Sequence, residues 1–433
     1  MPDHEPQPHP APRPLESGPG WAQWEDPHPK PSYLFALVAG DLRAVEDRFV
    51  TASGREVLLQ IWVRDGDQPR CAYAMDALKR SMAWDEAEYG REYDLDRFMI
   101  VAVDDFNMGA MENKGLNVFN SKYVLASPET ATDTDYKGIE TVIAHEYFHN
   151  WTGNRITCRD WFQLCLKEGL TVFRDQQFSA HERSAAVKRI EDVIRLRGAQ
   201  FREDGGPLAH PVRPDHYVEI NNFYTATVYE KGAEVIGMLR RLVGPETYRA
   251  ALDLYFARHD GQACTIEDWL AVFEDASGRD LTQFKLWYSQ AGTPRLRVRE
   301  SWDGRIYRLD LAQETPPTPD QPAKAPLVIP VAFGLLDAAG GEVESGVIEL
   351  DRAEQGVEWA LPARPVPSLL RGFSAPVLLE RETTAQERAF LLAHDSDPFN
   401  KWEAGRRAAL SALAALSADE AASVDAGHLA ALA

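Results

Sequence analysis

The sequence predicts an α+β multidomain protein, with a helical middle region between two regions rich in β-strands. Apolar runs with many β-branched and aromatic residues fill residues 21–63, as is typical of strands. Apolar residues then recur at helical spacing over most of residues 136–274. After residue 294 the alternation returns to a period of two, and an Ala- and Leu-rich segment begins near Thr383. We therefore expect β, helical, β and helical regions in this order.

The N-terminal region is expected to be mostly β. Residues 1–20 (MPDHEPQPHPAPRPLESGPG) are rich in proline and predict a disordered tail. The runs SYLFALVAG (32–40) and REVLLQIWV (55–63) predict strands. From Arg70 the pattern is helical, and RFMIVAV (97–103) predicts a short buried strand.

Six segments of the middle region carry apolar residues at helical spacing. They are residues 136–153, 160–179, 183–198, 228–242, 245–258 and 266–274. Further on, the turn signal Asp303-Gly304 separates two alternating runs, and PLVIPVAFGLL (326–336) adds another. Residues from about 294 to 382 should form a small β-sandwich, and helices should follow.

Composition and charge exclude some classes of partner. Lysine and arginine number 46 against 67 aspartates and glutamates, so the formal net charge is −21. A surface of this sign repels nucleic acid and anionic lipid. The four cysteines (Cys71, Cys158, Cys165 and Cys264) are dispersed, which is typical of free thiols in a reducing compartment. The sequence shows no signal peptide and no apolar run of roughly 20 residues, so we expect a cytoplasmic protein without a membrane partner.

The stretch TVIAHEYFHN (141–150) carries the main chemical signal. His145 and His149 are four residues apart, so on a helix both imidazoles lie on one face and can reach a single ion. The polar turn NWTGNR is expected to end this helix at Gly153, and the next helix returns Glu168 to the same point. Two imidazoles and one carboxylate leave a fourth position open for water, as a catalytic zinc ion requires. The alternative is an ordinary solvated helix face.

Glu146 lies between the two histidines and cannot easily bind the same ion. It can accept a proton from the attacking water and pass that proton to the leaving amine. We therefore expect Glu146 to be the general base.

A second informative stretch is NMGAMENKGLNVFN (107–120), which follows the predicted short strand. Its small residues allow the backbone to approach a ligand closely, next to a carboxylate. The expected substrate-binding residues are Gly109, Ala110, Met111, Glu112 and Asn113. By itself this stretch is also compatible with a plain loop.

The stretch GAMEN, followed 32 residues later by HEYFH and then by Glu168, resembles the aminopeptidase N family of zinc exopeptidases, which are gluzincins. WFQLCLKEGLTVFRDQ (161–176) and NNFYTATVYEKGAEVI (221–236) resemble the bacterial branch of this family. The resemblance extends from about Trp21 to Trp402. It implies a zinc aminopeptidase of the membrane alanyl aminopeptidase type, which removes the N-terminal residue of a peptide by attack of metal-activated water.

The resemblance also implies roles for single residues. One Zn²⁺ per chain would be bound by His145, His149 and Glu168. Glu146 would act as the base, and Glu112 would bind the free α-amino group of the substrate. A fixed carboxylate suits this role, because it forms a charge-assisted hydrogen bond with the ammonium group and sets the scissile bond one residue further along.

Four further positions are assigned by the resemblance or left open. Tyr229 matches the tyrosine that stabilises the oxyanion, although a tyrosine on an amphipathic helix is more often a core residue. Met108 and Tyr224 match residues that line the pocket for the N-terminal side chain. Asp175 lies two turns after Glu168 and could either orient a metal ligand or form a surface salt bridge.

The resemblance implies five regions. These are a disordered tail (1–20), the end of an N-terminal β-saddle domain (21–41), a thermolysin-like catalytic domain (42–292), a β-sandwich (293–382) and the start of a C-terminal helical domain (383–433). The family's complete saddle domain contributes another glutamate and a pocket wall, which have no match here. The chain is therefore expected to be truncated at both ends relative to the family.

We expect a monomeric enzyme that acts on peptides with a free N-terminus. Three alternative functions remain. A thermolysin-like endopeptidase would have to admit peptide on both sides of the scissile bond, which Glu112 disfavours. A non-catalytic remnant could keep the same residues and bind zinc or peptide. The third alternative is an epoxide hydrolase of a related branch. Those enzymes normally carry glycine at the position of Ala110, so Ala110 argues against it.

Overall fold

The computed structural model describes residues 13–419, 423, 424 and 426–432. The chain forms two compact units. Unit 1 contains residues 1–182 and 252–269, and unit 2 contains residues 183–251 and 270–433. One boundary follows residue 182, and the other two fall inside the helices α7 (Pro245–His259) and α8 (Ile266–Ser277). The fold class, α+β, is confirmed, whereas the predicted domain boundaries stay predictions.

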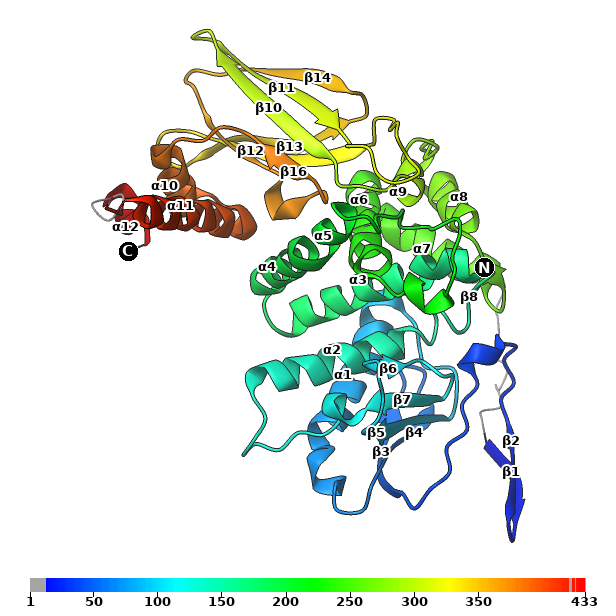
Figure 1. Ribbon diagram of the computed structural model, residues 1–433. Coiled ribbons are helices and arrows are strands. Elements are labelled where there is room, and N and C mark those ends of the chain that lie inside the picture. Colours follow the sequence, from blue (N-terminus) through cyan, green and yellow to red (C-terminus); the bar gives the residue numbers. More distant parts are fainter. Residues whose placement is uncertain (1–12, 420–422, 425, 433) are drawn as a thin grey trace. The chain divides into compact units, whose positions relative to one another are not determined.

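Unit 1 is built around a five-stranded mixed sheet with the strand order β3-β4-β5-β7-β6 (Figure 1). Its strands are β3 (Arg43–Val50), β4 (Glu56–Val63), β5 (Arg97–Val103), β6 (Ala110–Met111) and β7 (Leu116–Asn120). Its helices are α1 (Ala72–Tyr89), α2 (Asp133–Phe148) and α3 (Leu164–Glu182). A two-stranded pairing joins β8 (Thr157–Cys158) to β9 (Ala263–Cys264). The predicted strands at 55–63 and 97–103 are confirmed.

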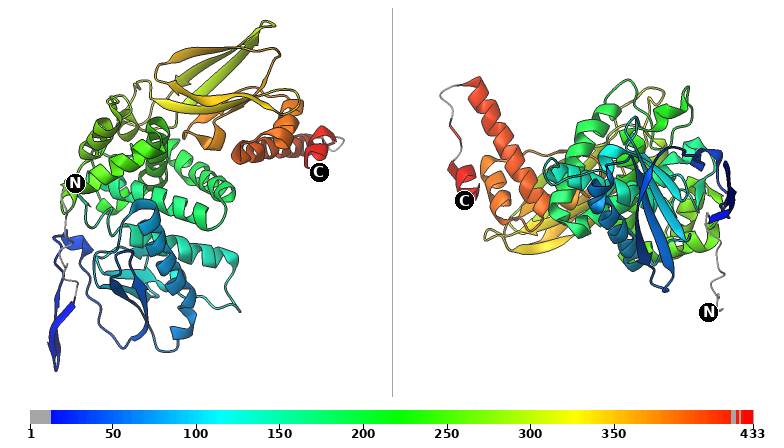
Figure 2. Two further views of the ribbon diagram at one scale, coloured as in Figure 1. Left: turned by 180° about the vertical axis from the view of Figure 1, so that it is seen from behind. Right: turned by 90° about the horizontal axis from the view of Figure 1, so that it is seen from below.

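The core of unit 1 explains why these segments fold together. Most apolar residues of β4 and β5 are buried, as expected for the central strands of a sheet. The helices α1, α2 and α3 pack against one another, with Trp84, Phe148 and Phe178 in mutual ring contact. Figure 2 shows α1 and α2 beside the sheet from two further directions. The sheet and these helices fix the two segments that carry the candidate site.

Two N-terminal predictions are wrong. Residues 13–18 of the expected disordered tail form the strand β1 (Arg13–Gly18), which pairs with β2 (Trp21–Glu25) across Gly20, whose φ is 83°. The first twelve residues of that tail lie outside the described residues. The run 32–40 is not a strand but a 3₁₀ turn, Ser32–Leu34, followed by irregular chain. Leu34 is buried, whereas Phe35 and Leu37 are exposed, so an apolar run without a sheet neighbour did not become a strand.

The helix ends also differ from the expected ones. Helix α2 ends at Phe148 rather than at Gly153, and Gly153 instead belongs to the following turn, with φ of 137°. Helix α3 begins at Leu164, after a 3₁₀ turn, Trp161–Gln163. The connection between the two helices is therefore longer than the periodicity predicted, and it brings more polar backbone to the candidate site.

Unit 2 combines helices with two sheets (Figure 1). One sheet has the order β14-β11-β10-β16 and the other β13-β12-β15. The strands are β10 (Arg295–Trp302), β11 (Ile306–Glu314), β12 (Ile329–Leu336), β13 (Glu342–Leu350), β14 (Glu354–Ala360), β15 (Val366–Leu369) and β16 (Leu378–Glu380). The rings of Phe333 and Trp359, one from each sheet, lie 5.1 Å apart. The predicted β-sandwich and its Asp303-Gly304 turn are confirmed, with φ of Gly304 at 99°.

The helices of unit 2 precede and follow this sandwich. They are α4 (Ala185–Arg195), α5 (Phe201–Asp204), α6 (Gly232–Val243), α9 (Leu286–Ser289), α10 (Ala385–His394), α11 (Pro398–Ala418) and α12 (Ala426–Leu432). Two π-helical turns, Leu196–Gln200 and Thr227–Lys231, interrupt the α-helical pattern. Such turns are rare and often occur at functional sites.

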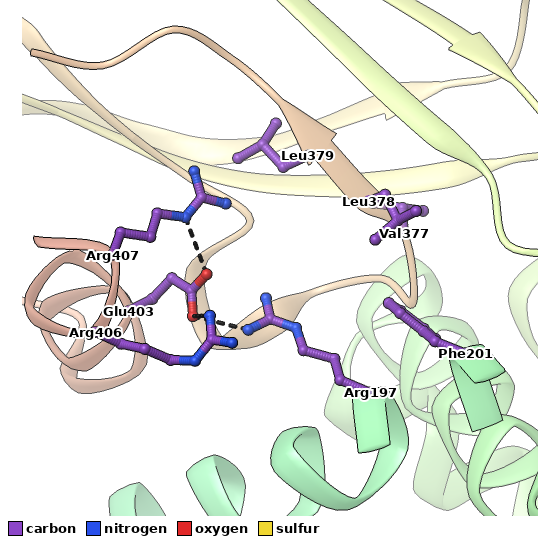
Figure 3. A pocket seen from close by; sticks show the side chains of 8 residues that line it. All are labelled: Arg197, Phe201, Val377, Leu378, Leu379, Glu403, Arg406 and Arg407. Carbon is purple, nitrogen blue, oxygen red and sulfur yellow. Dashed lines mark hydrogen bonds and ion pairs between the residues drawn. The ribbon is translucent and has the colours of Figure 1, made fainter. Parts of the chain in front are cut away.

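An ionic cluster attaches α11 to the first π-helical turn (Figure 3). Glu403 accepts hydrogen bonds from Arg197 at 2.7 Å and from Arg407 at 3.0 Å. The guanidinium of Arg197 also lies over the rings of Phe373, at 4.8 Å, and Phe399, at 5.8 Å. The cluster borders a cavity of about 280 Å³ lined by Arg197, Phe201, Val377, Leu378, Leu379, Glu403, Arg406 and Arg407. It fixes the first C-terminal helices to the rest of unit 2.

A buried charge network in unit 1 joins the loop after β6 to the end of α2. Asp94 accepts hydrogen bonds from Lys114 at 2.7 and 2.8 Å, from Asn150 at 2.9 Å and from Arg155 at 2.8 Å. Burial opposes ionisation of Asp94, but Lys114 and Arg155 hold its pKa below the ordinary value. Lys114 and Asn150 each follow directly after a residue of the candidate site, so Asp94 holds the two segments together.

We predict that Asp94→Asn lowers the free energy of unfolding by about 3–5 kcal/mol, because it leaves the buried ammonium of Lys114 without a charged partner. Asp96→Asn is the matched control, since Asp96 is 55% exposed and pairs with Arg55 at 3.3 Å; it should change stability by less than about 0.5 kcal/mol. Urea unfolding followed by tryptophan fluorescence measures both. Equal midpoints for the two variants would contradict the prediction.

Candidate metal centre

The two histidines of the HEYFH stretch meet at the C-terminal end of α2. His145 lies in its last turn and His149 is the residue directly after it. Their Nε2 atoms are 3.1 Å apart. Two imidazole nitrogens at this distance need a proton or a cation between them, because their lone pairs repel each other.

The other ring nitrogen of each histidine has a hydrogen-bond partner. His145 Nδ1 lies 2.8 Å from Asp175 Oδ2, and His149 Nδ1 lies 2.9 Å from the carbonyl oxygen of Thr152. Both partners are acceptors, so both Nδ1 atoms carry the proton, and in the neutral rings the Nε2 lone pairs are directed at each other. A Cβ atom at Gly153 would come within 2.9 Å of His149 Nδ1, and its φ of 137° favours glycine. Gly153 is therefore needed for the turn that orients His149.

Glu168, on α3, completes the group. Its Oε2 lies 3.4 Å from His145 Nε2 and 3.3 Å from His149 Nε2. This oxygen is buried and accepts no hydrogen bond from any residue that the structure describes. A buried carboxylate oxygen beside two convergent lone pairs fits a metal ion, and two imidazoles with one carboxylate form a donor set that zinc prefers. The three predicted ligands are thus brought together.

Glu146 faces the same place from α2. Its side chain is buried (6% exposed), and burial raises its pKa to about 8, with further contributions from Glu112 and Glu168. By contrast, the pKa of Glu168 lies well below the ordinary value, because Lys167 and His149 outweigh the effect of burial. The two neighbouring carboxylates therefore differ in pKa: Glu146 favours the protonated form and Glu168 the ionised form.

The predicted amine anchor, Glu112, also belongs to this place. Glu112, Glu146 and His149 each offer an atom within 4.8 Å of the others. Glu112 Oε1 accepts a hydrogen bond from Lys167 Nζ at 2.7 Å. Burial opposes ionisation of Glu112, but Lys167 and then His149 lower its pKa below the ordinary value. The anchor carboxylate is thus ionised and suited to bind a cation.

The rest of the GAMEN stretch forms the edge of the sheet. Ala110 and Met111 make up β6, which pairs with β7 and is the last strand in the described part of the sheet. The Gly109 carbonyl accepts a hydrogen bond from Asn120 N at 3.0 Å. Met108, before it, is 47% exposed. Asn113 is buried, and its side chain donates to the carbonyl oxygen of Tyr33 at 3.4 Å, so it supports the loop.

Tyr224 and Tyr229 belong to unit 2 and are described with it. Tyr229 lies in the second π-helical turn, Thr227–Lys231, and Tyr224 follows a 3₁₀ turn, Ile220–Phe223. Their ring centroids are 6.3 Å apart. The structure brings these two tyrosines together, and their roles stay predictions.

Sequence reasoning missed or left open several residues at the site. Asp175 is buried and hydrogen-bonded to His145, so its orienting role is supported over a surface salt bridge. Lys167 was not predicted, although its position next to Glu168 was a usable signal. Tyr33, whose ring lies 4.9 Å from that of Trp161 and 5.8 Å from Lys167 Nζ, belonged to a predicted strand and gave no signal.

This chain is similar to known proteins along most of its length. A model of the peptidase family M1 domain matches residues 73–288. The chain belongs to peptidase family M1. Residues 292–382 match an Ig-like domain of unknown function, DUF3458, and residues 385–433 match the ARM repeats of DUF3458_C. The family that the GAMEN and HEYFH stretches indicated is confirmed.

The relatives are aminopeptidases about twice as long as this chain. Aminopeptidase N of Caulobacter vibrioides is 58% identical over 397 residues, and aminopeptidase N of Escherichia coli is 55% identical over 403 residues. Each alignment covers 90% of this chain and 46% of the relative. A crystal structure of Legionella pneumophila aminopeptidase A in complex with aspartic acid matches with a TM-score of 0.83 and 34% identity, over 95% of this chain and 47% of that one. The chain thus spans about half the length of the relatives it matches.

We predict that Asp175→Ala weakens metal binding about 10- to 100-fold, because the ring of His145 loses the acceptor that fixes its tautomer and orientation. Competition of Zn²⁺ with a chromophoric chelator measures the affinity. The control is Glu182→Ala on the same helix, since Glu182 pairs with Arg80 and the exposed His181 and with none of the predicted metal ligands. An affinity unchanged by Asp175→Ala would refute the orienting role.

Proposed function

We propose that this chain is the zinc-binding part of an aminopeptidase that removes the N-terminal residue of peptides. The observation that carries the proposal is the convergence of His145 Nε2, His149 Nε2 and Glu168 Oε2 beside two further buried carboxylates. These three atoms would hold one Zn²⁺. When bound, the ion would polarise the scissile carbonyl and acidify a water molecule.

In this proposal Glu146 moves the proton. Its carboxylate accepts a proton from the attacking water and later donates it to the leaving amine. Without a bound cation, burial and the two neighbouring carboxylates keep the pKa of Glu146 at about 8. A cation bound by the neighbouring ligands would lower this pKa, since an opposite charge stabilises the ionised form.

Glu112 would fix where the peptide begins. An ionised, buried carboxylate forms a charge-assisted hydrogen bond with the α-ammonium group of the substrate. Lys167 is its partner in the structure and supports the ionised state of Glu112. The edge strand β6 offers backbone groups of Ala110 and Met111 to an extended peptide. Together these features would place the first peptide bond at the metal site.

Tyr229, Tyr224 and Met108 are proposed from their sequence motifs. Tyr229 would donate its phenolic hydrogen to the developing oxyanion. Tyr224 and the exposed thioether of Met108 would line the pocket for the N-terminal side chain, where a flexible methionine tolerates many shapes.

The carboxylate of Glu112 favours an exopeptidase over a thermolysin-like endopeptidase, because an endopeptidase must admit peptide on both sides of the scissile bond, whereas Glu112 would close one side. The four cysteines form no disulfide in the structure, which supports a reducing compartment such as the cytoplasm. No helix in the described part of the chain is both long and apolar enough to cross a membrane. We propose that the protein is a monomer and that its partners are peptides with a free N-terminus.

We predict that each chain binds one zinc ion tightly and that the Glu146→Ala variant still binds it. The variant loses the base but none of the three ligands, so turnover of a leucyl anilide should fall by about 10²- to 10⁴-fold at unchanged zinc content. Metal analysis and kinetics test the two halves separately. Glu168→Ala is the control that should lose the metal, and a Glu146→Ala rate within about twofold of wild type would count against the base.

We predict that acetylating a peptide's N-terminus abolishes its cleavage. Acetylation replaces the ammonium with a neutral amide, which removes the charge-assisted hydrogen bond between the substrate and Glu112, at a cost of roughly 1–3 kcal/mol or more. The scissile carbonyl is also displaced, because Glu112 sets its distance from the metal. Free and acetylated peptides of one sequence are compared, with Glu112→Ala alongside. Equal cleavage of both peptides would show an endopeptidase, and zinc binding without any cleavage would show a non-catalytic remnant.

A further inference from the structure

Two consecutive carboxylates, Glu203 and Asp204, hold the two ends of the π-helical turn Thr227–Lys231. They end α5, more than 20 residues before the turn. Tyr229 is the middle residue of this turn. All of these residues lie within unit 2.

Glu203 holds the beginning of the turn. Its Oε2 accepts hydrogen bonds from Thr227 N at 2.8 Å and from Thr227 Oγ1 at 2.7 Å, and its Oε1 accepts one from Ala226 N at 3.3 Å. Thr227 is completely buried, and its hydroxyl oxygen also accepts a hydrogen bond from Gln200 at 3.3 Å. The carboxylate thus satisfies backbone N–H groups that a helix start leaves without partners.

Asp204 holds the end of the turn. Lys231 Nζ, in a residue only 1% exposed, donates to Asp204 Oδ2 at 2.8 Å and to the carbonyl oxygen of Gly292 at 2.9 Å. Asp204 also accepts hydrogen bonds from Gly292 N at 3.2 Å and from Thr293 Oγ1 at 2.9 Å. A buried ion pair with this many hydrogen bonds cannot move apart without leaving a charge unpaired, at a high energetic cost.

We propose that Glu203 and Asp204 are positioning residues for the phenol of Tyr229. This proposal rests on the role of Tyr229 in the proposed function. Tyr229 is two residues from each held end, and its amide donates to the carbonyl oxygen of Thr225, two residues before the turn, at 3.1 Å. The position of its Cα atom and the direction of its Cα–Cβ bond are therefore set by backbone that the two carboxylates hold. Displacement of a catalytic group by about 1 Å can lower a rate about 100-fold.

The kinetic test is a double-mutant cycle of Glu203→Ala and Tyr229→Phe in the zinc-loaded chain, with a leucyl anilide as the substrate. Tyr229→Phe should lower kcat about 100-fold or more. Glu203→Ala alone should lower kcat roughly 10- to 100-fold with KM within about twofold, because the phenol acts in the transition state. In the Tyr229→Phe background, Glu203→Ala should cost less than about twofold. Independent, multiplicative losses would overturn the proposal.

Asp397→Ala is the matched control for loss of a capping carboxylate in unit 2. Asp397 Oδ1 accepts hydrogen bonds from Asn400 N at 2.8 Å and from Gly372 N at 3.1 Å, at the start of α11. This variant should keep the kcat of the wild type. Glu203→Gln, which retains one acceptor oxygen, should recover part of the lost kcat and serves if Glu203→Ala does not fold.

Amide hydrogen exchange separates this proposal from the proposed function. If no variant and no wild type turns over substrate, the aminopeptidase proposal fails for this chain. The positioning role of Glu203 and Asp204 is then tested by amide exchange at residues 226–231. This exchange should accelerate about tenfold or more in Glu203→Ala and in Asp204→Asn but not in Asp397→Ala. Unchanged exchange at these residues would overturn the positioning role.

Discussion

The candidate site depends on one constraint, the orientation of two imidazoles by their Nδ1 hydrogens. Asp175 and the Thr152 carbonyl accept these hydrogens, so both Nε2 lone pairs converge 3.1 Å apart. Helical spacing alone brings two histidines to one face but does not fix their ring rotations. The turn after α2, which requires Gly153, supplies the Thr152 carbonyl, and α3 supplies Asp175 and Glu168.

Charge balance is the second requirement of this site. Glu112, Glu146 and Glu168 are all buried near His149, and the ammonium of Lys167 contacts Glu112 and Glu168. Their pKa values diverge, since two carboxylates are ionised and Glu146 rises to about 8. Buried carboxylates in excess over cations are costly unless positive charge is bound. In the proposed function, a divalent metal ion and the ammonium group of the substrate would supply the two positive charges.

Other buried ion pairs keep the supporting segments in place. In unit 1, Asp94 joins the loop after β6 to the residue after His149 through Lys114 and Asn150. In unit 2, Lys231 and Asp204 close the turn that carries Tyr229. In both cases a buried charge binds several donors or acceptors at once, which gives a single arrangement rather than a range of conformations. Precise placement of loops near a site needs such interactions, because loops lack a repeating hydrogen-bond pattern.

The sequence by itself determined the features that depend on local spacing. The helices with His145 and Glu168, the alternation in residues 294–382 and the turn at Asp303-Gly304 follow from periods of 3.6 and 2 along the chain. Only the tertiary structure decided contacts between distant segments: Lys167 with Glu112, Asp94 with Arg155, and Glu203 with Thr227. It also decided that residues 32–40 do not form a strand, because a short apolar run becomes one only where a sheet edge is available to pair with it.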